Sequence, residues 1–422
     1  MAYTDIMKAR KISAYVQHLS TGSLGRILVF TGARQTGKTT LTRELFRPYT
    51  YLSIEDPVVR KSYAALTASQ WNTLYPRAIL DEVQKEPLLV ESIKSAYDQF
   101  PEVRYILLGS SQLLLLEKVR ESLAGRCSII ELFPLTVPEL ETHSFTDEVP
   151  DSPFQRFMKN PSAPFEYLPS FMLDPHMAEK KQSFDFYRTF GGYPALTNDS
   201  LTDDERYVWL KNYTATYLEH DIRDLASFRD LDPFIKLQQY FALHTGHIIN
   251  LSDVATQIGL SSKTVQRYIR YFELSYQAIV LKAWERNGTK RLIHAPKIHY
   301  MDYGVLQSVL QKRGGMTGCE FESLIIAELY KQMKTAGIDG TMYHLRTYDG
   351  YEIDLLIEMQ AGYAAFEIKM AEHVTDTDAR HLKTLGTVLD KPLLHSFVIS
   401  NDVNMRELAS GVSAVNAAWM MG

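Results

Sequence analysis

Residues 32–39 read Gly-Ala-Arg-Gln-Thr-Gly-Lys-Thr and match the pattern G-x-x-x-x-G-K-[ST], directly after the apolar run 27–31 and before a helical pattern. A strand, a glycine-rich loop and a helix in this order bring backbone N–H groups to a helix N-terminus, where they can surround phosphates. A chance glycine-rich turn would not have this context. The loop therefore predicts a site for ATP. The expected nucleotide contacts are Gly32, Ala33, Arg34, Gln35, Thr36, Gly37, Lys38, Thr39 and Thr40.

Two acids, Asp81 and Glu82, end the apolar run Ala-Ile-Leu at 78–80. Asp81 would hold the water shell of a Mg²⁺ ion that Thr39 also ligates, and Glu82 would polarise the attacking water. Lys38 would neutralise the β- and γ-phosphates. A strand that ends in solvated acids is the plainer interpretation, but the order of the two motifs favours ATP hydrolysis with Mg²⁺ as cofactor.

Short apolar runs alternate with helical patterns from Ile27 to about Leu140, which predicts a doubly wound parallel sheet of the α/β class. The run 105–108 is followed by small hydroxyl residues, so Ser110, with Ser111 as second choice, would sense the γ-phosphate. Arg126 follows Leu-Ala-Gly. It is either an arginine finger for the nucleotide of a neighbouring subunit or a surface arginine at a helix end.

These motifs together resemble the prokaryotic AAA+ ATPases of the archaeal-ATPase type, and the resemblance spans nearly the whole chain. It implies a P-loop AAA+ core, a helical lid in which Gly192 and Pro194 contact the adenine, and a C-terminal domain of unknown function. A homo-oligomer such as a hexamer is implied if Arg126 acts between subunits. The motifs are the loop at 32–39, Leu-Asp-Glu-Val-Gln at 80–84, Gly-Ser-Ser at 109–111, Leu-Ala-Gly-Arg at 123–126 and Phe-Gly-Gly-Tyr-Pro at 190–194.

The stretch 251–270 has the pattern of a helix-turn-helix. Apolar residues recur at core spacing, Gly259 would turn the chain, and Ser252 and then Ser261 or Ser262 would cap the two helices. The second helix and a following wing would expose side chains that contact DNA phosphates and base edges. The alternative is a winged helix used only for packing or for protein partners. The expected DNA contacts are Lys263, Gln266, Arg267, Arg270, Lys290 and Arg291.

The C-terminal part carries carboxylates and a lysine in an order typical of metal-dependent nucleases. Glu322 lies in a helical pattern, Asp354 in a strand pattern, and Glu367 and Lys369 on one face of the next strand. Asp354 and Glu367 would ligate Mg²⁺, and Lys369 would position or deprotonate the attacking water. The pattern resembles the PD-(D/E)XK nuclease superfamily, except that no proline precedes Asp354. Because such folds also serve for binding alone, cleavage and binding both stay open.

The length of 422 residues predicts several globular domains. The net charge of -5 makes any basic patch local, and the two cysteines lack metal spacing and fit a reducing cytoplasm. No run of apolar residues predicts a membrane span or secretion. The expected domains are a P-loop AAA+ ATPase core over 1–140, a proline-rich irregular insertion over 141–182, a helical lid over 183–246, a winged helix-turn-helix over 247–313 and a nuclease-like α/β domain over 314–422.

Together these patterns predict an ATP-hydrolysing AAA+ protein that binds and remodels or processes DNA, with branched DNA among the candidate substrates. The alternative function is a nucleotide-dependent signalling switch that acts on protein partners without DNA chemistry. DNA stimulation of ATP turnover distinguishes the two.

Overall fold

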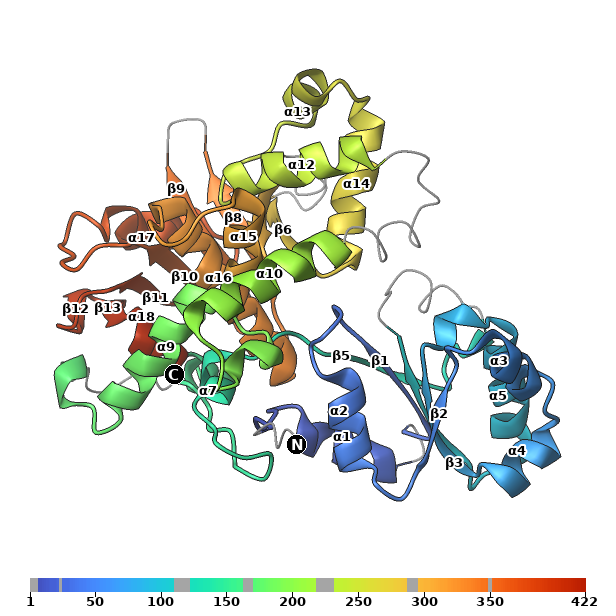
Figure 1. The fold of residues 1–422 in the computed structure, drawn as a ribbon. Helices are drawn as coiled ribbons and strands as arrows, with labels where there is room; N and C mark the ends of the chain where they lie inside the picture. Colours follow the sequence, from blue (N-terminus) through green and yellow to red (C-terminus); the bar gives the residue numbers. More distant parts are fainter. Residues whose placement is uncertain are drawn as a thin grey trace.

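The computed structural model describes residues 7–22, 25–109, 122–161, 170–217, 231–286, 295–347 and 351–422. These residues form an N-terminal α/β body and, beside it, a larger body built from the rest of the chain (Figure 1). The predicted γ-phosphate sensor Ser110 and the predicted wing contacts Lys290 and Arg291 lie outside the described residues.

A five-stranded parallel sheet forms the centre of the N-terminal body. Its order is β2-β3-β4-β1-β5, and every neighbouring pair is parallel. The C-terminal ends of all five strands therefore share one edge, from which the loops after β1 and β3 leave. The strands are β1 (Ile27–Thr31), β2 (Thr50–Ser53), β3 (Arg77–Asp81), β4 (Arg104–Leu108) and β5 (Ser128–Glu131).

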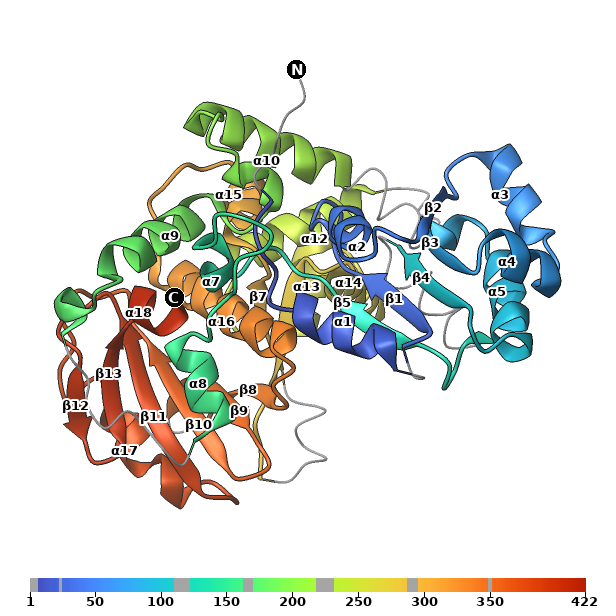
Figure 2. The same cartoon turned by 90° about the horizontal axis from the view of Figure 1, so that it is seen from below.

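Helices cover both faces of this sheet, as Figures 1 and 2 show. Side chains alternate along a strand, so Leu28 and Phe30 join the apolar cluster of the first two helices, whereas Ile27 and Val29 join the opposite cluster. The predicted doubly wound α/β fold is therefore confirmed. The helices are α1 (Ser13–Thr21) and α2 (Lys38–Leu45) on one face, and α3 (Pro57–Ala64), α4 (Ala68–Leu74) and α5 (Leu88–Gln99) on the other; η1 (Val83–Lys85) follows β3.

The segment 141–182, which its prolines predicted to be irregular, contains helices at residues 153–159, 171–173 and 177–182. Pro153 occupies the first turn of a helix, where its missing N–H costs nothing, and Ser152 caps that helix. Phe154 packs on Phe366 with ring centroids 6.0 Å apart, and Phe157 on Phe397 at 4.9 Å. The described residues 141–161 and 170–182, called the strap below, thus pack on the C-terminal sheet through Phe154 and Phe157. Its helices are α8 (Pro153–Lys159), η2 (Phe171–Leu173) and the start of α9 (Met177–Phe190), and α7 (Val137–Leu140) precedes it.

A helical layer follows the strap and contains the predicted helix-turn-helix. Gly259 turns the chain between α13 and α14 with φ 73°. Asn250, rather than Ser252, caps α13 by accepting from the backbone N–H of Ser252 at 3.0 Å, and Ser261 caps α14. The helices are η3 (Pro194–Thr197), α10 (Asp203–Tyr217), α12 (Asp232–Leu243), α13 (Leu251–Ile258), α14 (Ser262–Leu274) and α15 (Tyr303–Leu310).

An eight-stranded mixed sheet completes the larger body, in the order β12-β13-β11-β10-β9-β8-β6-β7 (Figure 2). The hairpin after the helix-turn-helix, β6 and β7, extends this sheet, because Lys282 and Ala283 pair with β8. The predicted wing and the predicted nuclease-like domain thus share one sheet. The strands are β6 (Ala278–Ala283), β7 (Lys297–Tyr300), β8 (Thr341–Arg346), β9 (Glu352–Glu358), β10 (Tyr363–Ile368), β11 (Leu393–Ser400), β12 (Arg406–Ala409) and β13 (Val412–Asn416).

Helices lie on both faces of the eight-stranded sheet. One face packs into the large apolar cluster that includes Phe366 and Phe397, and the opposite face forms a second cluster around Leu356 and Val398. The helices of this part are α16 (Gly318–Thr335), α17 (Arg380–Thr384), η6 (Leu385–Thr387) and α18 (Ala417–Met421).

Removing an aromatic anchor of the strap should destabilise the larger body. Phe154 is fully buried, so we expect Phe154→Ala to lower the free energy of unfolding by about 3–5 kcal/mol. Urea unfolding followed by circular dichroism measures the change. Met172→Ala is the matched control, because Met172 lies in the same strap and is 65% exposed. Equal stability of the two variants would show that the strap does not pack on the sheet.

Candidate nucleotide site and nucleic-acid interface

The glycine-rich loop connects β1 to α2 at the carboxyl edge of the parallel sheet. Its backbone enters the left-handed region at Gly32, with φ 147°, at Gln35, with φ 59°, and at Gly37, with φ 92°. A Cβ on Gly32 would lie 2.1 Å from the carbonyl oxygen of Leu132, so only glycine fits there. This conformation curls the loop so that successive N–H groups can converge on an anion.

Lys38 is the first residue of α2, and its ammonium group lies over the inside of the loop. Its Nζ donates to the carbonyl oxygens of Gly32 at 2.8 Å and Ala33 at 2.7 Å, and the residue is only 8% exposed. The lysine is thus already held where β- and γ-phosphates would lie in a loop of this type.

Asp81 joins the two predicted nucleotide motifs at the end of β3. One carboxylate oxygen, Oδ2, accepts from the Thr39 hydroxyl at 2.8 Å and from the Tyr51 hydroxyl at 2.8 Å, and Oδ1 accepts from the backbone of Glu82 at 3.0 Å. Burial and the neighbouring carboxylate of Asp81 raise the pKa of Tyr51 to about 12, so Tyr51 remains a donor at neutral pH. Thr39 and Asp81 therefore meet, as the sequence predicts.

Glu82 follows directly and adopts φ 61°, a left-handed conformation that is costly for a residue with a side chain. Its Oε2 accepts from the Gln84 amide at 2.5 Å. Strained residues of this kind occur mostly at functional sites, where the surrounding structure holds them in place. Glu82 lies next to the Asp81 carboxylate, at the same sheet edge as the loop.

The Gly192–Pro194 turn approaches the loop from the larger body. A Cβ built on Gly37 would lie 4.0 Å from Cγ of Pro194. The turn is held by Asp302, which accepts from the backbone N–H of Gly192 at 2.8 Å, and a side chain on Gly192 would collide with Leu135. The predicted lid residues Gly192 and Pro194 are thus brought beside the nucleotide loop.

The second helix of the helix-turn-helix exposes the four side chains predicted for it. Lys263, Gln266, Arg267 and Arg270 are all exposed, and their spacing places them along one side of α14. The opposite side of α14 is buried through Val265, Tyr268, Ile269 and Phe272. The helix therefore presents a polar, largely basic face to solvent.

The four predicted nuclease residues come together in the C-terminal part of the fold. Lys369 Nζ lies 2.9 Å from Glu367 Oε2 and 3.8 Å from Asp354 Oδ2, and Asp354 Oδ2 accepts from the backbone of Ile368 at 2.8 Å. Burial, together with the charge of Asp354, raises the pKa values of Glu322 and Glu367. The side chains that the sequence order singles out thus form one cluster in space.

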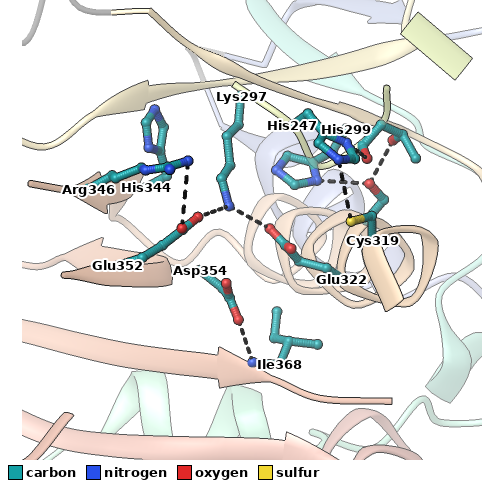
Figure 3. A network of polar contacts seen from close by, with 12 residues as sticks. His247, Lys297, His299, Cys319, Glu322, His344, Arg346, Glu352, Asp354 and Ile368 are labelled. Atoms are coloured by element: carbon teal, nitrogen blue, oxygen red, sulfur yellow. Dashed lines mark hydrogen bonds and ion pairs between the residues drawn. The ribbon is translucent and has the colours of Figure 1, made fainter. Parts of the chain in front are cut away.

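A further lysine, Lys297, reaches the same cluster (Figure 3). Its Nζ lies 3.1 Å from Glu322 Oε1 and 3.0 Å from Glu352 Oε1, and its side chain is 3% exposed. Lys297 lies within the range 247–313 that the sequence predicts to be a winged helix-turn-helix, and no sequence motif singles out Glu352. The pairing of β7 with β6, which in turn pairs with β8, places Lys297 beside Glu352 of β9.

Comparison with protein families divides the chain into three parts. Residues 24–141 match the family described as AAA domain. Residues 181–314 and 317–420 match two domains of unknown function, DUF8612 and DUF4143. Residues 24–141, which contain the nucleotide loop and most of the N-terminal body, therefore have a P-loop fold of the AAA type. The matched AAA domain contains the loop, Thr39, Asp81 and Glu82.

Two relatives match more of the chain than the AAA domain alone. Uncharacterized proteins of Mycobacterium tuberculosis and Mycobacterium bovis are each 24% identical over 355 residues, which are 81% of this chain and 70% of theirs. Among solved structures, a Walker-type ATPase of Pyrococcus abyssi is 13% identical with a TM-score of 0.47, over 73% of this chain and 97% of its own. A STAND signal-transduction ATPase of Pyrococcus horikoshii is 10% identical with a TM-score of 0.28, over 78% and 45%.

Arg126 of the AAA domain lies far from the loop of its own chain. It precedes β5, whose first residue pairs with Leu28 near the start of β1, so Arg126 lies at the sheet edge opposite the loop. Its guanidinium pairs with both carboxylate oxygens of Asp98, at 2.8 and 3.2 Å. A role as arginine finger therefore requires the nucleotide of another copy of this chain.

Tyr276 connects the AAA domain to the helix-turn-helix, and no sequence motif pointed to it. It follows the end of α14 with φ 59°, and its buried hydroxyl contacts the hydroxyl of Thr31 and donates to Glu131 Oε1 at 3.1 Å. Thr31 directly precedes Gly32 of the loop. A direct contact thus joins the strand that leads into the loop to the chain that leaves the helix with the basic face.

Among the residues that the structure describes, no helix combines the length and the apolar character needed to cross a bilayer.

Substitutions at Lys38 and Glu82 should separate binding from hydrolysis. We expect Lys38→Ala to abolish ATP binding, because the loop loses its only predicted phosphate-neutralising side chain. Glu82→Gln should retain binding but lower ATP turnover by about 10²-fold or more, because the amide cannot polarise water. Binding of a fluorescent ATP analogue and phosphate release measure the two steps.

Lys61→Ala is the control for these variants, since Lys61 is an exposed lysine on α3 of the same domain. Normal turnover by Glu82→Gln would show that another group activates the water.

Proposed function

We propose that this protein is a Mg²⁺-dependent ATPase that acts on DNA, with α14 as the DNA-contacting helix. The proposal rests on one observation, which is that the helix with the predicted DNA contacts leads directly to a contact beside the nucleotide loop. The exposed face of α14 bears Lys263, Arg267 and Arg270, and the chain leaving α14 places Tyr276 against Thr31 at the nucleotide loop. The predicted DNA contacts therefore lie along α14, and the chain leaving the C-terminal end of this helix reaches the strand that leads into the nucleotide loop.

The nucleotide site suits Mg²⁺-ATP. The Thr39 hydroxyl and the Asp81 carboxylate are hard oxygen donors 2.8 Å apart, the kind of ligand that Mg²⁺ takes beside phosphates. A Mg²⁺ ion held by them would neutralise phosphate charge. Lys38 would hold the β- and γ-phosphate oxygens, and Glu82 would orient the attacking water from the end of β3.

The α14 face suits a polyanion. Its positive side chains are long and exposed, so they can form ion pairs with phosphates and release counterions. Gln266 lies among them and can donate to and accept from base edges. Lys282 and Arg286, both exposed on and after β6, extend the positive surface beyond the helix. In a chain with net charge -5, this concentration of positive charge is local.

Removing two positive charges from α14 should abolish DNA stimulation of ATP turnover while the rate without DNA is retained. The test measures phosphate release by Arg267→Ala/Arg270→Ala with single-stranded, duplex and four-way-junction DNA. The salt dependence of DNA binding should also weaken, by about one unit of log-log slope for each phosphate that the variant no longer neutralises.

A matched control is Arg380→Ala/Lys383→Ala, which removes two exposed positive charges from α17. This helix lies in residues 314–422, called the C-terminal module below. If wild-type turnover is indifferent to every DNA and no DNA is bound, the proposal fails, and a switch that acts on protein partners becomes the better account.

Tyr276 should transmit DNA contact to the nucleotide loop. Tyr276→Phe keeps the ring in its buried site but removes the hydroxyl that contacts Thr31 and Glu131. We expect the ratio of DNA-stimulated to basal turnover to fall, while DNA affinity measured by fluorescence anisotropy is retained. Tyr15→Phe, at a 55% exposed tyrosine, is the control. An unchanged ratio would exclude this route of coupling.

A further inference from the structure

Lys297 is the first residue of β7, in the hairpin that follows the helix-turn-helix. Its side chain turns inward between α16 and β9, as Figure 3 shows, although it lies in a stretch of sequence rich in basic residues. β7 is the edge strand of the eight-stranded sheet, and α16 packs against it. The register of β7 thus delivers a lysine into the C-terminal module from outside that module's own sequence.

The environment of Lys297 favours its charged form. Burial alone would lower the pKa of this ammonium, but the carboxylates of Glu322, Asp354 and Glu352 outweigh burial and raise it. Glu352 lies between two cations, because its Oε1 is 3.0 Å from Lys297 Nζ and its Oε2 is 3.8 Å from Arg346 Nη1. An unpaired buried ammonium would be very costly, so the pairing is what allows the lysine to lie there.

Each of the three predicted nuclease carboxylates has a lysine or a backbone donor at one of its oxygens. Glu322 contacts Lys297, Glu367 contacts Lys369, and Asp354 accepts a backbone hydrogen bond. Mg²⁺ needs a near-octahedral set of oxygen atoms at about 2.1 Å. Within the described residues, no group of three or more His, Cys, Asp or Glu side chains is arranged to hold a metal ion. The cluster does not fit the metal that the predicted nuclease site requires.

We propose that Lys297 is a built-in cation that takes the place of a divalent metal in the acidic cluster. The C-terminal module then binds no catalytic metal and does not cut DNA. Through its ion pairs with Glu322 of α16 and Glu352 of β9, Lys297 instead anchors the β6–β7 hairpin, which follows directly after the helix-turn-helix. This inference concerns the C-terminal cluster alone and does not depend on whether DNA stimulates the ATPase.

The test measures Mn²⁺ binding by nucleotide-free protein, through loss of the electron paramagnetic resonance signal of hydrated Mn²⁺. All variants carry Thr39→Ala, which removes the hydroxyl ligand at the nucleotide site. We expect the Thr39→Ala protein to have no Mn²⁺ site that depends on Asp354. Adding Lys297→Met should create one such site, and further adding Asp354→Asn should remove it. Lys282→Met, at an exposed lysine on the neighbouring strand β6, should create none.

Two results would overturn the proposal. One is Mn²⁺ binding by the Thr39→Ala protein that is lost with Asp354→Asn, which would show that Lys297 does not exclude the metal. The other is a folded Lys297→Met variant that gains no site. If Lys297→Met fails to fold, the comparison of Thr39→Ala with Thr39→Ala/Asp354→Asn still decides, because it needs no change at Lys297.

Discussion

The nucleotide loop is packed between the edge of its own sheet and the larger body, and this packing links the parts of the molecule. Thr31, the residue before the loop, contacts Tyr276, the carbonyl oxygen of Thr36 accepts from Arg10 at 3.4 Å, and Gly37 faces Pro194. A loop held in this way cannot change shape without altering contacts to the larger body. The loop and the C-terminal end of the helix-turn-helix are therefore joined through Thr31 and Tyr276.

Buried ion pairs stabilise the segment that joins the N-terminal body to the larger body. Arg10 pairs with Glu139 at 3.5 Å, with both side chains buried. In α16, Glu328 accepts from the backbone N–H of Val137 at 2.7 Å and lies 3.3 Å from Lys331. Each of these charges would be strongly destabilising without its partner, so they fix the segment between the two bodies in one geometry. The same helix, α16, carries Glu322 to the C-terminal cluster.

Local patterns predicted much of the fold and of the site. The loop at 32–39, the acids at 81–82 and the helix-turn-helix are each contained in a short stretch, and short-range rules of turns, caps and apolar spacing govern such stretches. Two expectations from the sequence differ from the structure, and each difference has an identifiable physical cause. The prolines of the strap suggested irregular structure, but Pro153 begins a helix that Phe154 anchors on the sheet. Asn250 caps α13 because a cap precedes the first helical residue.

By itself, the sequence determined the parallel sheet with its phosphate-binding loop, the two acids beside it and the basic helix face, because each depends on neighbours in the chain. Only the tertiary structure decided where β7 pairs, and that pairing moved Lys297 from an expected surface wing into a cluster of buried carboxylates. The same holds for Tyr276, whose role depends on Thr31, 245 positions away. Contacts between distant segments follow from packing, which no local pattern in the sequence specifies.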